Sequence, residues 1–94
     1  MPETLFRIRW PDGGVETYYS PSTVVKQFLV VGQSYSLEDF LELSRLALRA
    51  ASDRVNALYG MHCSRAMAQL EAIESKGKTQ RGDADPVVVE AFSI

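Results

Sequence analysis

The chain has 94 residues, 46% of them hydrophobic and 23% charged, with a formal net charge of −2. A chain of this length has room for one core, which predicts a single α+β domain over residues 1–94. The lack of an excess of Lys and Arg argues against a nucleic-acid partner. No segment approaches the roughly 20 apolar residues of a membrane span, and no leader pattern opens the chain, so we expect a cytoplasmic protein without membrane contact.

Two N-terminal segments, FRIRW and VETYYS, alternate apolar and polar residues with the period of strands that are buried on one face. Between them, PDGG at residues 11–14 has the composition of a hairpin loop. A four-residue loop would place Trp10 opposite Val15 and keep the apolar side chains on one face. A three-residue loop would place Ile8 opposite Glu16 and mix the two faces, so the four-residue loop is predicted.

A short α-helix is predicted after the hairpin. Ser20 suits the N-cap and Pro21 the first helical position, and Gly32 is placed to end the helix. One face of this helix would be apolar, formed by Val24, Val25, Phe28 and Leu29.

The strongest local signal predicts a long helix over residues 37–59. Ser36 can cap it, Asp39 follows at capping-box spacing, and Gly60 has the residue type preferred just after a helix. Its apolar residues cover more than half of the circumference, which predicts a helix central to the domain. The expected water-facing arc consists of Glu38, Glu42, Arg45, Arg49, Ser52, Asp53 and Asn56.

A third helix over residues 65–76 is predicted after Ser64, antiparallel to the long helix. Residues 77–86 are interpreted as a flexible linker. The final segment, PVVVEAFSI, resembles a strand with too few polar residues for a solvated face. It would pair with the hairpin or, less economically, with another subunit, which gives the order β-β-α-α-α-β.

Cys63 is the only candidate catalytic residue that the sequence offers. A thiolate near the start of the third helix would be stabilised by free N–H groups. No base and orienting partner can be identified for it, and a packed cysteine is the favoured interpretation. With one cysteine and one histidine, His62, no metal site is predicted, and no cofactor is expected.

Arg54 lies on the apolar arc of the long helix, where its guanidinium must either find an anion or extend to water. It is therefore a candidate contact for a small anionic metabolite or for an acidic group of a partner. Tyr18, Tyr19 and Tyr35 are candidates to line a binding pocket, although aromatic side chains on a half-buried sheet usually pack with their hydroxyls outward.

Taken together, RWPDG, YSPS, GQSY, ASDRV followed by YG, and CSRA resemble a family of small bacterial nitrogen-starvation response proteins of unknown biochemical activity. The resemblance implies genes that lie beside a nitrilase, a radical enzyme, an acetyltransferase-like protein and flavin-dependent enzymes, in clusters linked to nitrogen scavenging. Arg54, Cys63 and Ser64 match the family pattern and become positions to test. Members often carry a cysteine in place of Tyr18, so a two-thiol mechanism is not expected in this chain.

These observations favour a noncatalytic accessory protein in nitrogen scavenging, with Arg54, Tyr18, Tyr35 and Ser64 as binding candidates. Its partner would be a protein or a small metabolite. One alternative is a small thiol-dependent enzyme or carrier that uses Cys63, which alkylation at neutral pH would test. Another is a self-associating structural subunit, a homo-oligomer, suggested by the wide apolar arc of the long helix and by the VVV strand.

Overall fold

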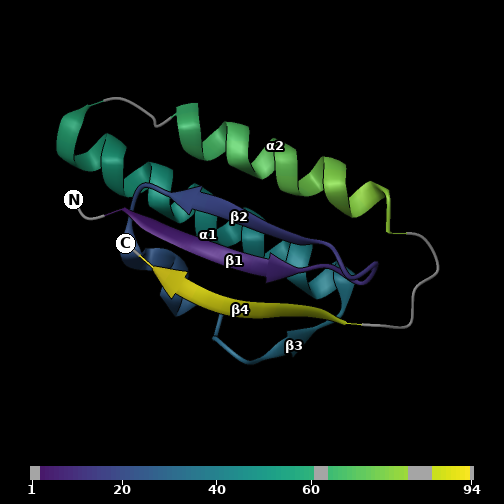
Figure 1. The fold of residues 1–94 in the computed structure, drawn as a ribbon. Helices are drawn as coiled ribbons and strands as arrows, with labels where there is room; N and C mark the ends of the chain where they lie inside the picture. Colours follow the sequence, from purple (N-terminus) through teal and green to yellow (C-terminus); the bar gives the residue numbers. More distant parts are fainter. Residues whose placement is uncertain (1–2, 61–63, 81–85, 94) are drawn as a thin grey trace.

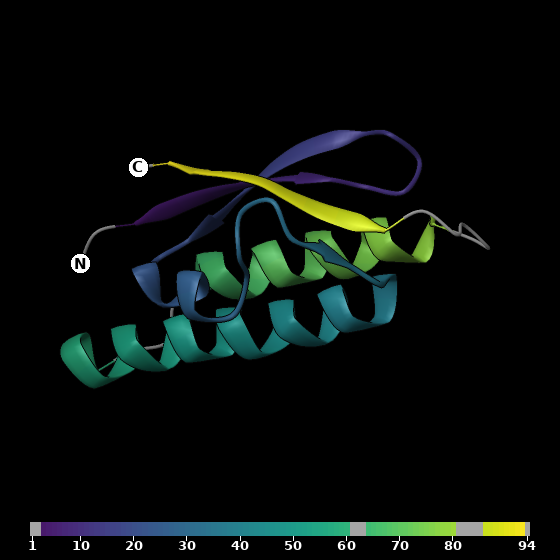
Figure 2. The same ribbon diagram turned by 90° about the horizontal axis from the view of Figure 1, so that it is seen from below.

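The computed structural model describes residues 3–60, 64–80 and 86–93, which form a sheet and one layer of helices (Figure 1). The strands are β1 (Thr4–Arg9), β2 (Val15–Ser20), β3 (Ser34–Tyr35) and β4 (Val87–Ser93). They form an antiparallel sheet in the order β2-β1-β4-β3. The helices α1 (Leu37–Tyr59) and α2 (Ser64–Lys78) lie on the same side of this sheet (Figure 2). The predicted α+β class is confirmed.

The predicted register of the hairpin is wrong by one residue. Ile8 pairs with Glu16, and Phe6 pairs with Tyr18 rather than with Tyr19. Glu16 therefore shares a side of the sheet with Ile8, but it lies on an edge strand and stays exposed. A mixed pair is tolerated there because the carboxylate reaches water past the edge.

The loop itself explains the register. The N–H of Trp10 donates to the carbonyl of Gly14 at 2.8 Å, and the N–H of Gly13 donates to the carbonyl of Trp10 at 2.8 Å. Gly13 has φ +89°, so three residues turn the chain and the last of them is left-handed. A tight turn followed by a left-handed glycine matches the twist of the strands, and this local geometry decides the pairing.

The predicted first α-helix is a shorter 3-10 helix, η1 (Thr23–Gln27), so the described residues contain two α-helices rather than three. Its N-cap is Ser22, whose Oγ accepts from the N–H of Val24 at 3.2 Å. The Ser20 hydroxyl instead donates to the Ser22 carbonyl at 2.7 Å. Two adjacent valines in so short a segment disfavour further helix, because β-branched side chains crowd the helical backbone.

The bounds of α1 are confirmed. The Ser36 hydroxyl accepts from the N–H of Asp39 at 3.2 Å, and Gly60 closes the helix with φ +75°. The helix is not central, however. Leu46 and Leu58 are 45% and 61% exposed, whereas Ser52, which was expected in the water-facing arc, is buried. With the sheet and α2 on one side only, the apolar arc is wider than the surface available to bury it.

The helix α2 starts at Ser64 and continues through Gly77, past the predicted end. A Cβ atom on Gly77 would lie 3.0 Å from a methyl carbon of Leu41, so glycine allows the close approach to α1. Gln80 is also buried. Residues 77–80 are therefore packed rather than a flexible linker, and residues 81–85 of that prediction lie outside the described residues.

The strand β4 pairs with β1 and β3 of the same chain, as the economical prediction had it. A β-bulge interrupts its pairing with β1: Ile8 lies opposite Val89 and Arg7 opposite Ala91, which leaves Glu90 as the extra residue. The bulge reverses the alternation, so that Val89 and Phe92 both contact the core. The other side of the strand is not covered by a described element, so the expectation that β4 lacks a solvated face is wrong.

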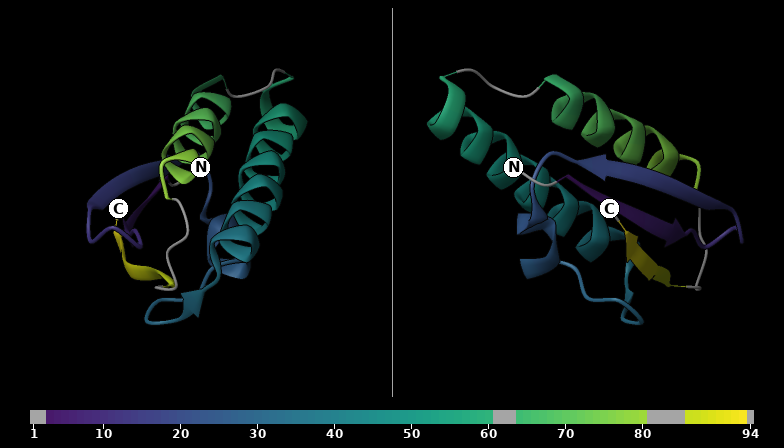
Figure 3. Two further views of the ribbon diagram at one scale, coloured as in Figure 1. Left: turned by 90° about the vertical axis from the view of Figure 1, so that its right-hand side faces the viewer. Right: turned by 60° about the vertical axis from the view of Figure 1, so that its left-hand side comes forward.

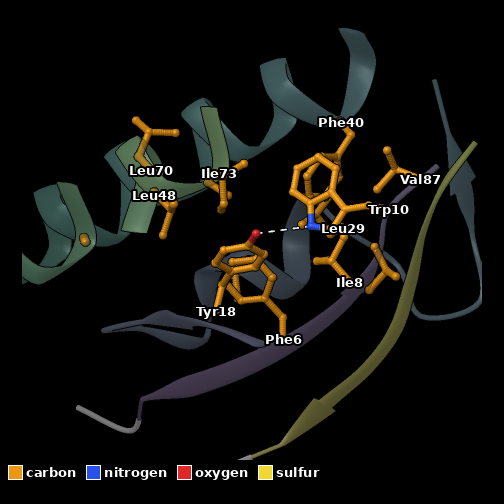
Figure 4. Packing of buried hydrophobic residues seen from close by; sticks show 14 residues of the cluster. Phe6, Ile8, Trp10, Tyr18, Leu29, Phe40, Leu48, Leu70, Ile73 and Val87 are labelled. Carbon is orange, nitrogen blue, oxygen red and sulfur yellow. Dashed lines mark hydrogen bonds between the residues drawn. The ribbon is translucent and has the colours of Figure 1, made fainter. Parts of the chain in front are cut away.

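The core lies between the sheet and the helices (Figure 4). Trp10 packs edge to face against Phe40 and Tyr18, with ring centroids 5.4 and 6.3 Å apart. Its Nε1–H donates to the Tyr18 hydroxyl at 3.2 Å. Burial raises the pKa of Tyr18 to about 12, so this hydroxyl stays neutral. Fully buried side chains around these rings include Phe6, Ile8, Val25, Leu29, Leu48, Ile73, Val87 and Val89.

A candidate interaction surface on the open face of the sheet

The side of the sheet that faces away from the helices is the candidate functional site, and we call it the open face. No helix or strand among residues 3–60, 64–80 and 86–93 lies over it (Figures 2 and 3). Alternation in β1 places Arg7 and Arg9 here, because Phe6 and Ile8 face the core. By cross-strand pairing and the Glu90 contacts, the face comprises Leu5, Arg7, Arg9, Val15, Thr17, Tyr19, Ser34, Val88, Glu90, Ala91 and Ser93.

A charged cluster lies near the centre of the open face. The Nε–H of Arg7 donates to Oε1 of Glu90 at 3.1 Å, and the Nε–H of Arg9 donates to Oε2 at 2.6 Å. The arginine side chains are 53% and 51% exposed, and Glu90 is 19% exposed. One carboxylate thus holds two guanidinium groups side by side, and the bulge in β4 places it between them.

This arrangement leaves binding capacity unused. A guanidinium carries five N–H donors in a planar fork, and Glu90 takes only the Nε–H of each arginine. Within the described part of the chain, no group accepts from the terminal nitrogens of Arg7 or Arg9. One carboxylate against two guanidinium groups also leaves one net positive charge. The cluster can therefore bind a further anionic group at its exposed side.

Apolar side chains flank the cluster. Arg9 lies between Val15 on β2 and Val88 on β4, directly opposite on both sides. Val15 is 44% exposed, although it belongs to a regular strand. A positive centre between two valines is suited to binding another protein, because the partner could cover the valines while it neutralises the charge.

The β2 edge of the open face is fixed by α2. The N–H of Tyr19 points outward from the sheet and donates to Oε1 of Gln69 at 2.9 Å. The Arg65 guanidinium stacks on the Tyr19 ring, 4.0 Å from its centroid. This contact adds a third cation at the margin of the open face and holds an aromatic ring in place.

A comparison with family models identifies the family of the chain. A family described as nitrogen starvation-induced protein NitG matches residues 5–92. The chain belongs to this family. The resemblance drawn from the sequence motifs is thereby confirmed, and the matched segment contains every residue of the open face except Ser93. Comparison with curated proteins and with solved structures gave no match.

The structure does not bring the binding residues predicted from the sequence together. Arg54 is exposed on α1, in the helical layer, and Ser64 is exposed at the start of α2. Tyr18 belongs to the core, and Tyr35 lies on the opposite edge strand, where its hydroxyl accepts from the N–H of Val30 at 3.0 Å. Cys63 and His62 lie outside the described residues.

A second polar cluster joins the hairpin loop to the end of α2. Oδ1 of Asp12 accepts from the N–H of Gly14 at 2.8 Å, and Oδ2 accepts from the Gln80 amide at 3.1 Å and from the Lys76 ammonium at 3.4 Å. Gln80 in turn accepts from the N–H of Asp12 at 3.0 Å. With its donors and acceptors paired in this way, the cluster fixes the loop against α2 and is structural.

The described residues offer no enclosed site. Their surface has no pocket, and they contain no group of three His, Cys, Asp or Glu side chains that could hold a metal ion. Neither α1 nor α2 combines the length and apolar character of a membrane-spanning helix, as far as the described residues extend.

The sequence contained part of the signal for the open face. Arg7 and Arg9 alternate with buried residues, which places both on one side of β1. Glu90 could not be assigned to them, because the sequence does not give the register in which β4 pairs with β1. The charged cluster therefore depends on the pairing of two segments more than 80 residues apart.

Proposed function

We propose that this member of a nitrogen starvation-induced family is a noncatalytic accessory protein that binds a protein partner through the open face of its sheet. A role in nitrogen scavenging agrees with the family to which the chain belongs. The observation that carries the proposal is the composition of the open face: partly apolar strands surround a positioned pair of arginines, and no described element covers them.

A sheet that is solvated on one face usually carries polar residues there. The open face departs from this pattern, because Val15, Val88 and Ala91 lie beside the charged cluster. Exposed apolar residues grouped around fixed polar groups are typical of interaction surfaces. The absence of a pocket among the described residues favours a protein over a small metabolite as the partner.

Affinity capture from nitrogen-limited cells tests the proposal with two matched variants. Val15→Gln/Val88→Gln makes the open face polar, and Leu46→Gln/Leu58→Gln changes exposed leucines in the helical layer. We expect the wild-type chain and the helical-layer variant to capture the same protein, and the open-face variant to lose it about tenfold or more, since a tenfold change corresponds to about 1.4 kcal/mol.

Circular dichroism of both variants checks that they fold. Equal capture by the open-face variant, or loss of capture in the helical-layer variant alone, would place the interaction elsewhere. A wild-type chain that captures no protein reproducibly would contradict the proposal altogether.

A further inference from the structure

We infer that the partner docks an acidic segment onto the open face, with a carboxylate against the terminal guanidinium nitrogens of Arg7 and Arg9. This inference rests on the proposed function and specifies the chemistry of the partner. It follows from the way in which the two arginines are held, and not from their presence alone.

The first step is the geometry of the cluster. Glu90 is bound by the Nε–H of both arginines, at 3.1 and 2.6 Å. Contact through Nε leaves the four terminal N–H groups of each guanidinium without an acceptor among the described residues. One of the four is parallel to the Nε–H, and the other three point in other directions because the guanidinium is planar and rigid. Arg7 and Arg9 are two residues apart on one face of an extended strand, about 7 Å along it, so both can approach one acidic side chain. Glu90 acts as a positioning residue in this arrangement.

The second step is the charge balance. Two guanidinium groups and one carboxylate leave one positive charge, which one further carboxylate neutralises. An arginine side chain that is already oriented loses less conformational entropy on binding than a free one. The chain as a whole has a net charge of −2, whereas the cluster on the open face is positive. Such asymmetry favours approach by an acidic surface.

A second copy of the chain is a poorer occupant. Two open faces stacked about an axis at the cluster would bring two positive centres together, which costs free energy when the centres are removed from water. An acidic segment with apolar neighbours meets both properties of the surface. Its carboxylate reaches Arg7 and Arg9, while its apolar side chains cover Val15 and Val88.

The inference is tested by NMR with defined peptides. The probe is an octapeptide of serine and valine, blocked at both ends, with one aspartate near its centre, and the matched control peptide carries asparagine instead. We expect the aspartate peptide to shift the Nε–H resonances of Arg7 and Arg9 at millimolar concentration, and the asparagine peptide to shift them at least threefold less. Raising the salt concentration from about 20 to 300 mM should reduce the shifts that the aspartate peptide causes, because salt screens exposed charges.

Two protein variants complete the experiment. Arg9→Gln should reduce the shift of the Arg7 resonance at least threefold, whereas Arg49→Gln, at an exposed arginine of α1, should leave it unchanged. Equal shifts with the aspartate and asparagine peptides, no shift with either, or the same effect of Arg49→Gln would overturn the inference. Inorganic phosphate at the same concentration is the remaining arm: a shift from phosphate equal to that from the aspartate peptide would show general anion binding and would also overturn it.

The two proposals fail in different ways. The aspartate and asparagine peptides could cause equal shifts while the Val15→Gln/Val88→Gln variant still loses its captured partner. In that case the open face binds a protein, but not through an acidic segment. If that variant retains capture, the proposed function itself is contradicted.

Discussion

The two faces of β1 have opposite roles although their residues alternate along one strand. Phe6 and Ile8 are at most 1% exposed and pack under the helices, whereas Arg7 and Arg9 are about half exposed and share one carboxylate. The inner face stabilises the fold through buried apolar area. The outer face contributes little to stability, because exposed ion pairs are worth roughly 0 to 1 kcal/mol. The cluster of Arg7, Arg9 and Glu90 is ordered although it contributes little to the stability of the fold, which agrees with a role in binding a partner.

The largest expected effect separates the two faces by stability. Trp10→Ala removes a ring that is 1% exposed and packs against Phe40 and Tyr18. We expect the free energy of unfolding to fall by about 3 to 5 kcal/mol, from lost contacts and the remaining cavity. Val15→Ala on the open face is the control and should cost about 0.5 kcal/mol or less. Urea titration followed by circular dichroism measures both, and similar losses would contradict the division between the faces.

An intermediate effect is expected at Phe92, which faces the core because the bulge in β4 precedes it. Phe92→Ala removes a partly buried ring that lies opposite Phe6 and packs against the core. Complete burial of a phenylalanine contributes about 1.5 to 3 kcal/mol, so the loss for this partly buried ring should be about 1 to 2 kcal/mol.

Glu90→Ala, two residues away on the open face, is the matched control for that substitution. It removes only the two ion pairs, so it should cost about 1 kcal/mol or less. Equal stability of the two variants in the same urea titration would show that Phe92 contributes no more to the fold than the exposed ion pairs do.

The smallest expected effect concerns the cluster that joins the hairpin loop to α2, and it depends on pH. The pKa of Asp12 is lowered from its ordinary value of 3.8, first by the hydrogen bond from the Gly14 N–H, then by the Gln80 amide, and also by Lys76. A pKa that is lower in the folded state stabilises the fold above pH 3.8, and this contribution is lost as the pH falls through the folded-state value.

Wild type should therefore be more stable than Asp12→Asn near neutral pH, and the difference should shrink as the solution is acidified below pH 3.8. Thermal unfolding of both chains across this range measures the difference. A difference that stays constant down to pH 2 would show that the charge of Asp12 does not stabilise the fold.

Local signals in the sequence predicted several elements well. The cap at Ser36, the left-handed Gly60 and the apolar periodicity between them determine α1, because each acts within one or two helical turns. The alternation in β1 likewise predicts which of its residues are buried. The same reasoning failed at the hairpin register, where turn geometry outweighed side-chain pairing, and in the segment after Ser20, where α-helical propensity was overestimated.

The candidate site was less predictable than the fold. The tyrosines and Arg54 stood out because of their residue types, yet Tyr18 is part of the core and Arg54 lies in the helical layer. Arg7 and Arg9 looked like the ordinary polar side of a strand. They share the carboxylate of Glu90, which lies more than 80 residues further along the chain. Residue type alone does not predict a contact between such distant positions.

The sequence by itself determined the helix bounds of α1, the alternation of β1 and membership of a nitrogen starvation-induced family, because short-range periodicity, capping residues and motif order are all written along the chain. Only the tertiary structure decided which side of the sheet the helices cover and where the bulge falls in β4. Both depend on contacts between distant segments, and together they place Glu90 between Arg7 and Arg9 on a face that the described helices leave open.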